Sequence, residues 1–232
     1  MTHPKVPALS AELAKRIRLV RRDIGGLLFH FTRQPESEWI EIATPYGGTK
    51  SMSASAGAVL RKILEEGRLI GSSVWTAGEN CICFTEAPIH EFNSIFSLVA
   101  ISSSEAERPR YEPYGVAVTK QWLFSQGGRP VIYDHPDALA SMPHGQRYRF
   151  VPYDPTRGID FTWEREWRFH GDQLTLDPRA TLAVVPTADE AFEIAYDLAT
   201  IEAEYDREGN PESSYYVPKW LTVSLDLFGF EP

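Results

Sequence analysis

Hydrophobic and polar positions divide the chain into helices and strands that do not follow a regular order. Apolar residues at helical spacing predict helices at 11–22, 56–66, 90–99 and 189–199. Short apolar or alternating runs predict strands at 27–32, 81–87, 114–118, 130–133, 181–186 and 221–230. Because strands and helices are mixed without strict alternation, the pattern predicts an α+β fold and not a doubly wound parallel sheet.

Glycines and prolines mark the ends of the predicted elements. Gly67 is the expected C-cap of helix 56–66. Residues 33–53 read as a surface loop with a short strand at 39–42, and residues 134–156 read as an irregular insertion. We therefore expect a single domain over residues 1–232, with an N-terminal basic helix at 11–22 and a core from about residue 27.

Two carboxylates stand close together in the stretch Trp163–Phe169. In an extended chain, side chains two positions apart share a face at roughly 6 to 7 Å, so Glu164 and Glu166 are predicted to point together from one strand. Like charges held this close repel, which is tolerated chiefly where a cation or a developing positive charge is the partner. The alternative is a solvated edge strand with Glu–Arg pairs across strands.

Two further predicted strands carry polar side chains at or near their ends. His30 and Thr32 share one face of the first strand, with phenylalanines on the other face. Thr85 and Glu86 end the strand that begins at Cys81. A histidine on an apolar strand is more often a satisfied core residue than a catalytic one, and both interpretations of His30 stay open.

Charge and composition narrow the classes of function. The 232-residue chain has a net charge of −9 and an isoelectric point near 5.2, which argues against non-specific binding to a phosphate backbone. The exception is a basic stretch within the predicted helix 11–22. A basic amphipathic helix could meet nucleic acid, but a helix that docks by its apolar face is the more common case.

The sequence contains no membrane-spanning run, signal-peptide pattern or metal-ligand spacing. We therefore expect a cytoplasmic protein that does not bind a membrane or a metal. Cys81 and Cys83 are too close in sequence for a useful structural disulfide. A nucleophile elbow, a phosphate loop, a dinucleotide glycine fingerprint and an HExxH motif are all missing from the sequence.

Several short motifs, in a fixed order, resemble one known fold. L-F-H-F-T, I-L-E-E-G-R-L, C-I-C-F-T-E-A-P and E-R-E-W-R together are similar to the ADP-ribosyltransferase fold, especially its DarT-type and abortive-infection AbiGi-like families of bacterial toxin–antitoxin and phage-defence loci. The segments Y-G-V-A-V-T-K-Q-W-L and R-P-V-I-Y are most similar to the AbiGi-like proteins. The resemblance covers about residues 27–186 and implies a split mixed or antiparallel sheet with flanking helices.

The same resemblance implies roles for individual residues. His30, with Thr32 beside it, would contact the adenosine-side ribose of NAD, which is the substrate in these families. Glu166 would be the catalytic carboxylate and Glu164 the second member of the pair. A fixed carboxylate suits this reaction because breaking the nicotinamide–ribose bond develops oxocarbenium character.

For two further roles the resemblance leaves more than one candidate residue. These roles are the aromatic ring that stacks on nicotinamide and the arginine near the NAD donor. The family has a Tyr on the second core strand that stacks on nicotinamide. In this chain the role would fall either to Phe84, which stands at that place, or to Tyr46 from the loop. Thr85 completes the candidate cofactor-binding residues. The candidate arginines are Arg33, Arg61 and Arg68.

The resemblance implies an NAD-dependent ADP-ribosyltransferase that acts as a toxin or phage-defence effector. It would transfer ADP-ribose to a macromolecular acceptor, protein or nucleic acid, and would have a cognate antitoxin or toxin as partner. One alternative is a non-catalytic antitoxin, immunity or binding protein on the same scaffold. Another is a metal-independent nuclease that uses His30 and Glu166.

Overall fold

The computed structural model describes residues 10, 12–13, 16–17, 25–44, 48–74, 76–92, 96 and 111–231. The predicted helices 11–22 and 90–99 lie largely outside the described residues, and so does Tyr46. Among the described helices, none is long and apolar enough to cross a membrane.

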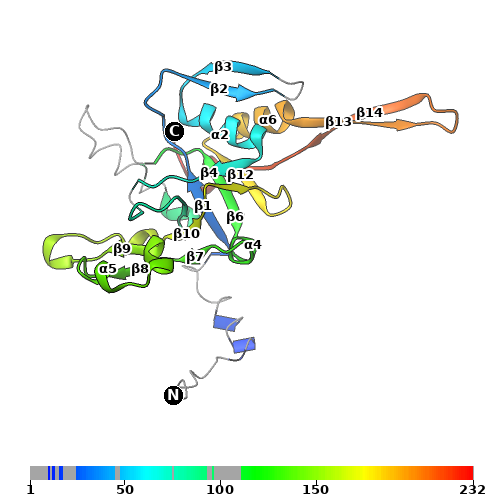
Figure 1. The fold of residues 1–232 in the computed structure, drawn as a ribbon. Helices are drawn as coiled ribbons and strands as arrows, with labels where there is room; N and C mark the ends of the chain where they lie inside the picture. Colours follow the sequence, from blue (N-terminus) through cyan, green and yellow to red (C-terminus); the bar gives the residue numbers. More distant parts are fainter. Residues whose placement is uncertain are drawn as a thin grey trace.

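A four-stranded mixed sheet forms the centre of the molecule, in the order β1-β6-β12-β15 (Figure 1). β1 (Leu27–Phe31), β6 (Gly115–Thr119) and β12 (Thr181–Val185) pair antiparallel, and β15 (Leu221–Ser224) adds parallel to β12. Strands β6 and β12 are nearly continuous apolar runs because both faces of the sheet are covered.

A second sheet contains β5 (Cys81–Phe84), β10 (Trp167–His170) and β7 (Arg129–Pro130), in the order β5-β10-β7. It is joined to β1 where Phe29 and Thr85 exchange backbone hydrogen bonds of 2.9 and 2.8 Å. The end of β5 is thereby held against the middle of β1.

The other strands form two-stranded pairs around these two sheets. These are β2 (Trp39–Ala43) with β3 (Thr49–Ser53), β4 (Arg68–Ile70) with β11 (Gln173–Thr175), β8 (Ile132–Asp134) with β9 (Phe150–Pro152), and β13 (Ala199–Tyr205) with β14 (Pro211–Pro218). The described α-helices are α2 (Ala56–Glu66), α4 (Lys120–Ser125), α5 (Ala138–Ser141) and α6 (Ala188–Asp197). Short 3-10 turns occur at Ile89–Glu91, His144–Arg149, Pro155–Arg157, Thr162–Glu164 and Asp226–Phe228.

Helix α2 forms as its sequence predicts. Ser55 accepts a hydrogen bond from the Ala58 N–H at the N-terminus, and Gly67 ends the helix in the left-handed region with φ 66°. The helix buries Leu60 and Leu64, which recur four residues apart on one face.

The two faces of the central sheet support two apolar clusters. Leu28, Val116 and Val118 face a cluster that also contains Leu60 of α2 and Phe84 of β5. On the other face, Phe29, Ala117 and Val184 of the sheet belong to a second cluster. The other members named here, Phe92, Phe96 and Leu225, come from outside the sheet. The central sheet is therefore buried between two layers.

The α+β class is confirmed, together with most of the predicted strands. Three predictions were wrong in detail. The run 130–133 divides between β7 and β8, and the last strand ends at Ser224. The loop 33–53 holds a hairpin. In addition, the segment 199–218 forms a second hairpin that was not predicted.

Candidate functional site

The stretch Trp163–Phe169 is not a continuous strand, so the predicted paired-carboxylate face was wrong. Residues Thr162–Glu164 form a 3-10 turn, and Arg165 follows with a φ of 45°, in the left-handed region. Strand β10 begins only at Trp167. A non-glycine residue rarely adopts positive φ, so the backbone at Arg165 is unusual. The turn there gives Glu164 and Glu166 different surroundings.

Glu166 is bound by an arginine. Its Oε1 and Oε2 accept hydrogen bonds of 2.7 and 3.1 Å from Nε and Nη2 of Arg168, respectively. Arg168 is 3% exposed. Nη1 of Arg168 also donates to the carbonyls of Tyr148 and Phe150, at 2.8 and 3.0 Å. The pair therefore ties strand β10 to the segment 148–150, and the charge of the expected catalytic carboxylate is neutralised.

Arg168 stays charged in this position. Burial by itself would lower the pKa of the guanidinium, but hydrogen bonding to Glu166 and its negative charge outweigh that effect and raise the pKa. Burial also raises the pKa of the nearby Cys81 thiol to about 11, and that of Cys83 well above its usual range, with Glu166 adding to the effect. Both thiols are therefore protonated near neutral pH and are poor nucleophiles.

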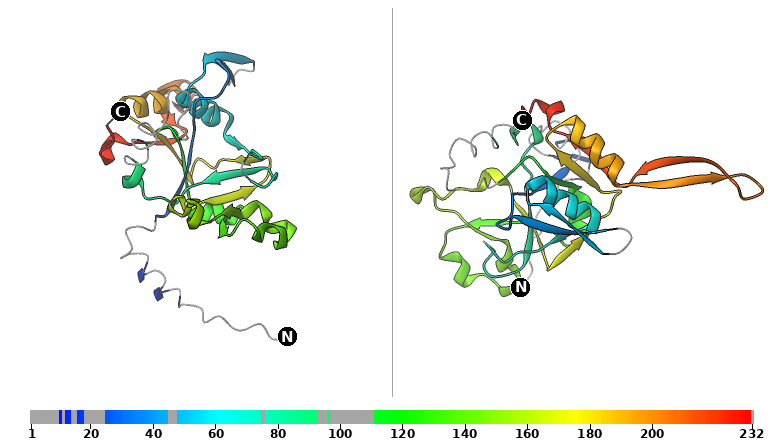
Figure 2. Two further views of the ribbon diagram at one scale, coloured as in Figure 1. Left: turned by 90° about the vertical axis from the view of Figure 1, so that its left-hand side faces the viewer. Right: turned by 90° about the horizontal axis from the view of Figure 1, so that it is seen from above.

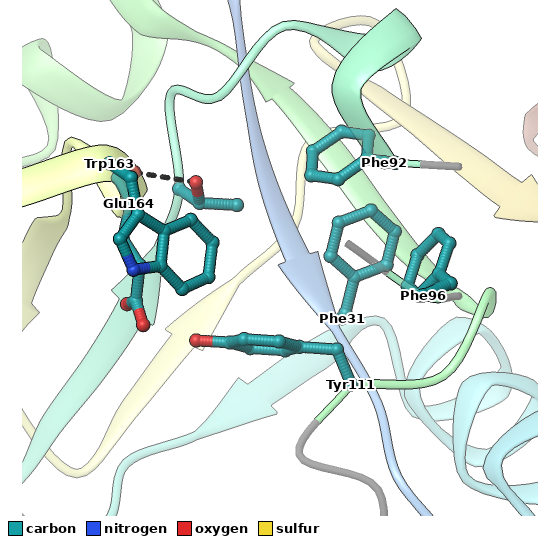
Figure 3. A pocket seen from close by; sticks show the side chains of 7 residues that line it. Phe31, Phe92, Phe96, Tyr111, Trp163 and Glu164 are labelled. Atoms are coloured by element: carbon teal, nitrogen blue, oxygen red, sulfur yellow. Dashed lines mark hydrogen bonds between the residues drawn. The ribbon is translucent and has the colours of Figure 1, made fainter. Parts of the chain in front are cut away.

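Glu164 instead lines a small aromatic hollow between β1 and the end of β5 (Figure 3). The hollow has a volume of about 10 Å³, which is room for roughly one water. Glu164 is 4% exposed, whereas Trp163 at the same hollow is 45% exposed. The remaining lining residues are Phe31, Thr85, Phe92, Phe96 and Tyr111.

Thr85 fixes the turn that carries Glu164. The Thr85 hydroxyl donates a 2.6 Å hydrogen bond to the Glu164 carbonyl and accepts one of 3.1 Å from the Ala87 N–H. The Glu86 N–H also donates to the Glu164 carbonyl, at 3.2 Å. The structure thus brings together two predicted site residues, Thr85 and Glu164, that lie 79 positions apart.

His30 lies on the other face of β1 from Phe31 and does not line this hollow. Its Nδ1 is 2.8 Å from the Cys83 carbonyl, and since a carbonyl only accepts, Nδ1 carries the proton. Burial lowers the pKa of His30 below its ordinary value, despite the opposing effect of this hydrogen bond. The ring is neutral near pH 7 and acts as a core histidine that joins β1 to β5.

Thr32 and Phe84 also make structural contacts. The Thr32 hydroxyl is placed 2.9 Å from the Ala56 carbonyl and 3.0 Å from the Tyr114 carbonyl, and so holds the start of α2 near β6. Phe84 is 2% exposed within the core, so its ring offers no open face for stacking on nicotinamide. Tyr46, the other candidate for stacking, is outside the described residues.

The candidate arginines do not line the hollow either. Arg61 forms a 2.8 Å ion pair with Asp197, and Arg68 lies 3.3 Å from Glu66, while Arg33 is exposed. Sequence reasoning also missed five lining residues, Phe31, Phe92, Phe96, Tyr111 and Trp163. Phe31 and Trp163 are sequence neighbours of predicted site residues, His30 and Glu164. That adjacency was the one feature of the sequence that could have pointed to them.

A second polar network begins at Glu86. This carboxylate pairs with Lys120 and accepts a 2.9 Å hydrogen bond from Nε1 of Trp167. Lys120 Nζ also lies 5.5 Å from the centre of the Trp167 ring. Glu86 therefore fastens β6 and α4 to β10, beside an open hollow of about 610 Å³ that Lys120 and Trp167 help to line.

Within the part of the chain that the structure describes, no group of three or more His, Cys, Asp or Glu side chains is placed to hold a metal ion. Comparison of the chain with protein-family models, with curated proteins and with solved structures gave no match. The resemblance to ADP-ribosyltransferases therefore stays a prediction based on short motifs.

Proposed function

We propose that the protein is an NAD-dependent ADP-ribosyltransferase in which Glu164, and not Glu166, is the catalytic carboxylate. The observation that carries this proposal is the position of Glu164, a buried carboxylate that Thr85 fixes at the edge of an aromatic hollow. Glu166 is less suited because Arg168 binds both of its oxygens.

The chemistry of the hollow suits the donor. Nicotinamide in NAD is a flat cationic ring, and the faces of Phe31, Tyr111 and Trp163 attract such a ring by stacking and cation–π interaction. In Figure 3 the hydroxyl end of Tyr111 points toward Trp163 and Glu164, so the aromatic and carboxylate groups converge.

In the proposed reaction the ribose–nicotinamide bond breaks, and its electron pair leaves with the nicotinamide nitrogen. The ribose carbon becomes an oxocarbenium ion, which the negative charge of Glu164 stabilises more than it stabilises ground-state NAD. A nucleophile of the acceptor then bonds to that carbon and loses a proton. Water as the acceptor would give ADP-ribose.

Entry of NAD requires the hollow to widen, because a volume of about 10 Å³ admits only a water-sized group. Trp163 is the half-exposed side chain at its rim and is the one we expect to move. A change in tryptophan fluorescence on addition of NAD, lost in Trp163→Phe, would report this movement.

The proposed biological role is that of a toxin or phage-defence effector with a macromolecular acceptor. The test incubates the full chain with NAD and measures nicotinamide release and the melting temperature. We expect release and a raised melting temperature, because a ligand that binds the folded state stabilises it. Glu164→Gln should abolish release while the shift remains, and Glu38→Gln, an exposed control, should behave like the wild type.

Two results would overturn this proposal. Release that persists in Glu164→Gln would exclude Glu164 as the catalytic group. If neither nicotinamide release nor a shift in melting temperature is observed, NAD is excluded as a ligand. That result would favour the non-catalytic immunity or binding protein on this scaffold.

A further inference from the structure

The hairpin β13–β14 extends away from the body of the protein, on the far side of helix α6 from α2 (Figures 1 and 2). All residues of its two strands are exposed except Ala199 and Val217, which are partly exposed. A two-stranded hairpin is at best marginally stable in water unless it packs on something. We refer to α6 together with this hairpin, residues 188–218, as the acidic arm.

The acidic arm carries nearly all of the protein's net charge. It contains nine Asp or Glu residues and one Arg, a net charge of −8, whereas the whole chain has −9. The other residues are therefore close to electrically balanced. The acidic residues are Asp189, Glu190, Glu193, Asp197, Glu202, Glu204, Asp206, Glu208 and Glu212, and the basic one is Arg207.

Two carboxylates near the base of the arm contact the body of the protein, whereas in the part of the chain that the structure describes Glu202 and Glu204, farther out, contact only the hairpin itself. Asp197 forms an ion pair with Arg61, and Glu190 accepts a 2.6 Å hydrogen bond from the Tyr114 hydroxyl. Among the described residues, Glu202 and Glu204 form no ion pair and contact only hydroxyls across the hairpin. The hairpin therefore presents a negative field that the protein itself does not neutralise.

An aromatic stripe crosses from the helix to the hairpin. Phe192 and Tyr196 are one helical turn apart and are 76% and 61% exposed. The Tyr196 ring lies 4.8 Å from that of Tyr216, which pairs across the hairpin with Ile201. Tyr216 and Ile201 are 53% and 63% exposed, so a contiguous apolar strip remains open to solvent.

We propose that the acidic arm is a docking surface for a basic segment of a partner protein, one in which Lys or Arg residues are interspersed with apolar residues. Glu202 and Glu204 lie on the face of the hairpin opposite Ile201 and Tyr216. The negative field of the arm would attract the basic side chains, and the exposed rings would take the apolar side chains and the cations over their faces. A second copy of this chain is disfavoured, since two arms of charge −8 repel each other. This inference does not depend on the proposed NAD chemistry.

The test uses the full chain and three labelled peptides of equal length, in which Lys alternates with Leu, Lys alternates with Ser, and Glu alternates with Leu. Fluorescence anisotropy measures binding at low and at physiological salt. We expect the Lys/Leu peptide to bind best, with weaker binding at higher salt, and the Glu/Leu peptide not to bind.

Matched variants locate the site on the arm. Glu202→Lys with Glu204→Lys should weaken Lys/Leu binding about tenfold or more, while Glu36→Lys with Glu38→Lys changes the net charge equally at exposed positions away from the arm and should have a much smaller effect. Tyr196→Ser with Tyr216→Ser should weaken binding of the Lys/Leu peptide more than binding of the Lys/Ser peptide, which loses only the contacts of its cations with the rings. The melting temperature of each variant checks that the domain folds.

Three results would overturn the proposal. Equal losses in the two charge-reversal variants would mean that only net charge matters. Equal affinity for the Lys/Leu and Lys/Ser peptides would remove the aromatic stripe from the site. Sedimentation as a dimer that the tyrosine variant abolishes would assign the surface to a second copy of the chain.

Discussion

Arg168 holds Glu166 through two hydrogen bonds, of 2.7 and 3.1 Å, at a position where the arginine is 3% exposed. This contact separates the two carboxylates of the E-R-E-W-R motif into a structural one and one that lines a hollow. The guanidinium and the carboxylate neutralise each other's charge. Replacement of either residue alone would therefore leave the other as a buried charge without a partner.

Replacement of Arg168 by Gln is therefore expected to lower the free energy of unfolding by about 3–5 kcal/mol, because Glu166 would keep its charge without a partner. The double variant Arg168→Gln/Glu166→Gln should lose less than the sum of the single variants. Urea unfolding measures all of them. Arg61→Gln, which breaks a pair with the 48% exposed Asp197 side chain, is the control and should cost below about 1 kcal/mol; an equal cost for both arginines would contradict the structural role of the pair.

Acidification should destabilise the protein through His30. Burial lowers the pKa of His30 below 6.5 in the folded state, so the unfolded chain takes up a proton first as the pH falls. The free energy of unfolding should then decrease below about pH 6.5, and the decrease continues until the pH passes the folded-state pKa. His30→Asn, whose amide can still donate to the Cys83 carbonyl, should flatten this dependence between about pH 7 and 5. The exposed His90→Asn is the control; if it has the same effect, His30 is not the group responsible.

Loss of the Thr85 hydroxyl should disturb the turn that carries Glu164. Thr85→Val removes the 2.6 Å hydrogen bond to the Glu164 carbonyl and should cost about 1–3 kcal/mol of stability. If Glu164 acts on NAD as proposed, nicotinamide release should fall further than the stability loss explains. Thr85→Ser keeps the donor and should restore release; failure of Ser to do better than Val would show that the hydroxyl does not position Glu164.

Gly115 should not tolerate a side chain. A Cβ at this position in β6 would lie 2.3 Å from the His30 carbonyl oxygen and 3.0 Å from the Phe31 Cα, both backbone atoms of the paired strand. Gly115→Ala is expected to cost at least about 1–3 kcal/mol, because the strands must separate. Gly145→Ala meets no atom within 4 Å and should change stability by less than about 0.5 kcal/mol. Thermal unfolding compares the two, and similar melting temperatures would contradict the close approach of β1 and β6.

Local patterns predicted the elements whose residues repeat with one clear period. Helix α2 has apolar residues at helical spacing and a glycine at its end, and β12 is a continuous β-prone run, so both could be placed from sequence. The alternation of His30 with Phe29 and Phe31 likewise predicted which side chains share a face of β1. The hairpin β13–β14 was not predicted because only β13, A-T-I-E-A-E-Y, alternates apolar and polar residues, whereas its partner β14, P-E-S-S-Y-Y-V-P, has no clear period.

The sequence by itself determined the α+β class, the positions of the main helices and strands, and the presence of a charged E-R-E-W-R motif. Only the tertiary structure decided which groups the two glutamates of that motif lie against. Arg168 reaches Glu166 while it also binds carbonyls some twenty residues earlier, and Thr85 holds Glu164 from a strand 79 residues away. Such contacts depend on how distant segments pack, and a local alternation of charge and bulk is compatible with either a strand or a turn.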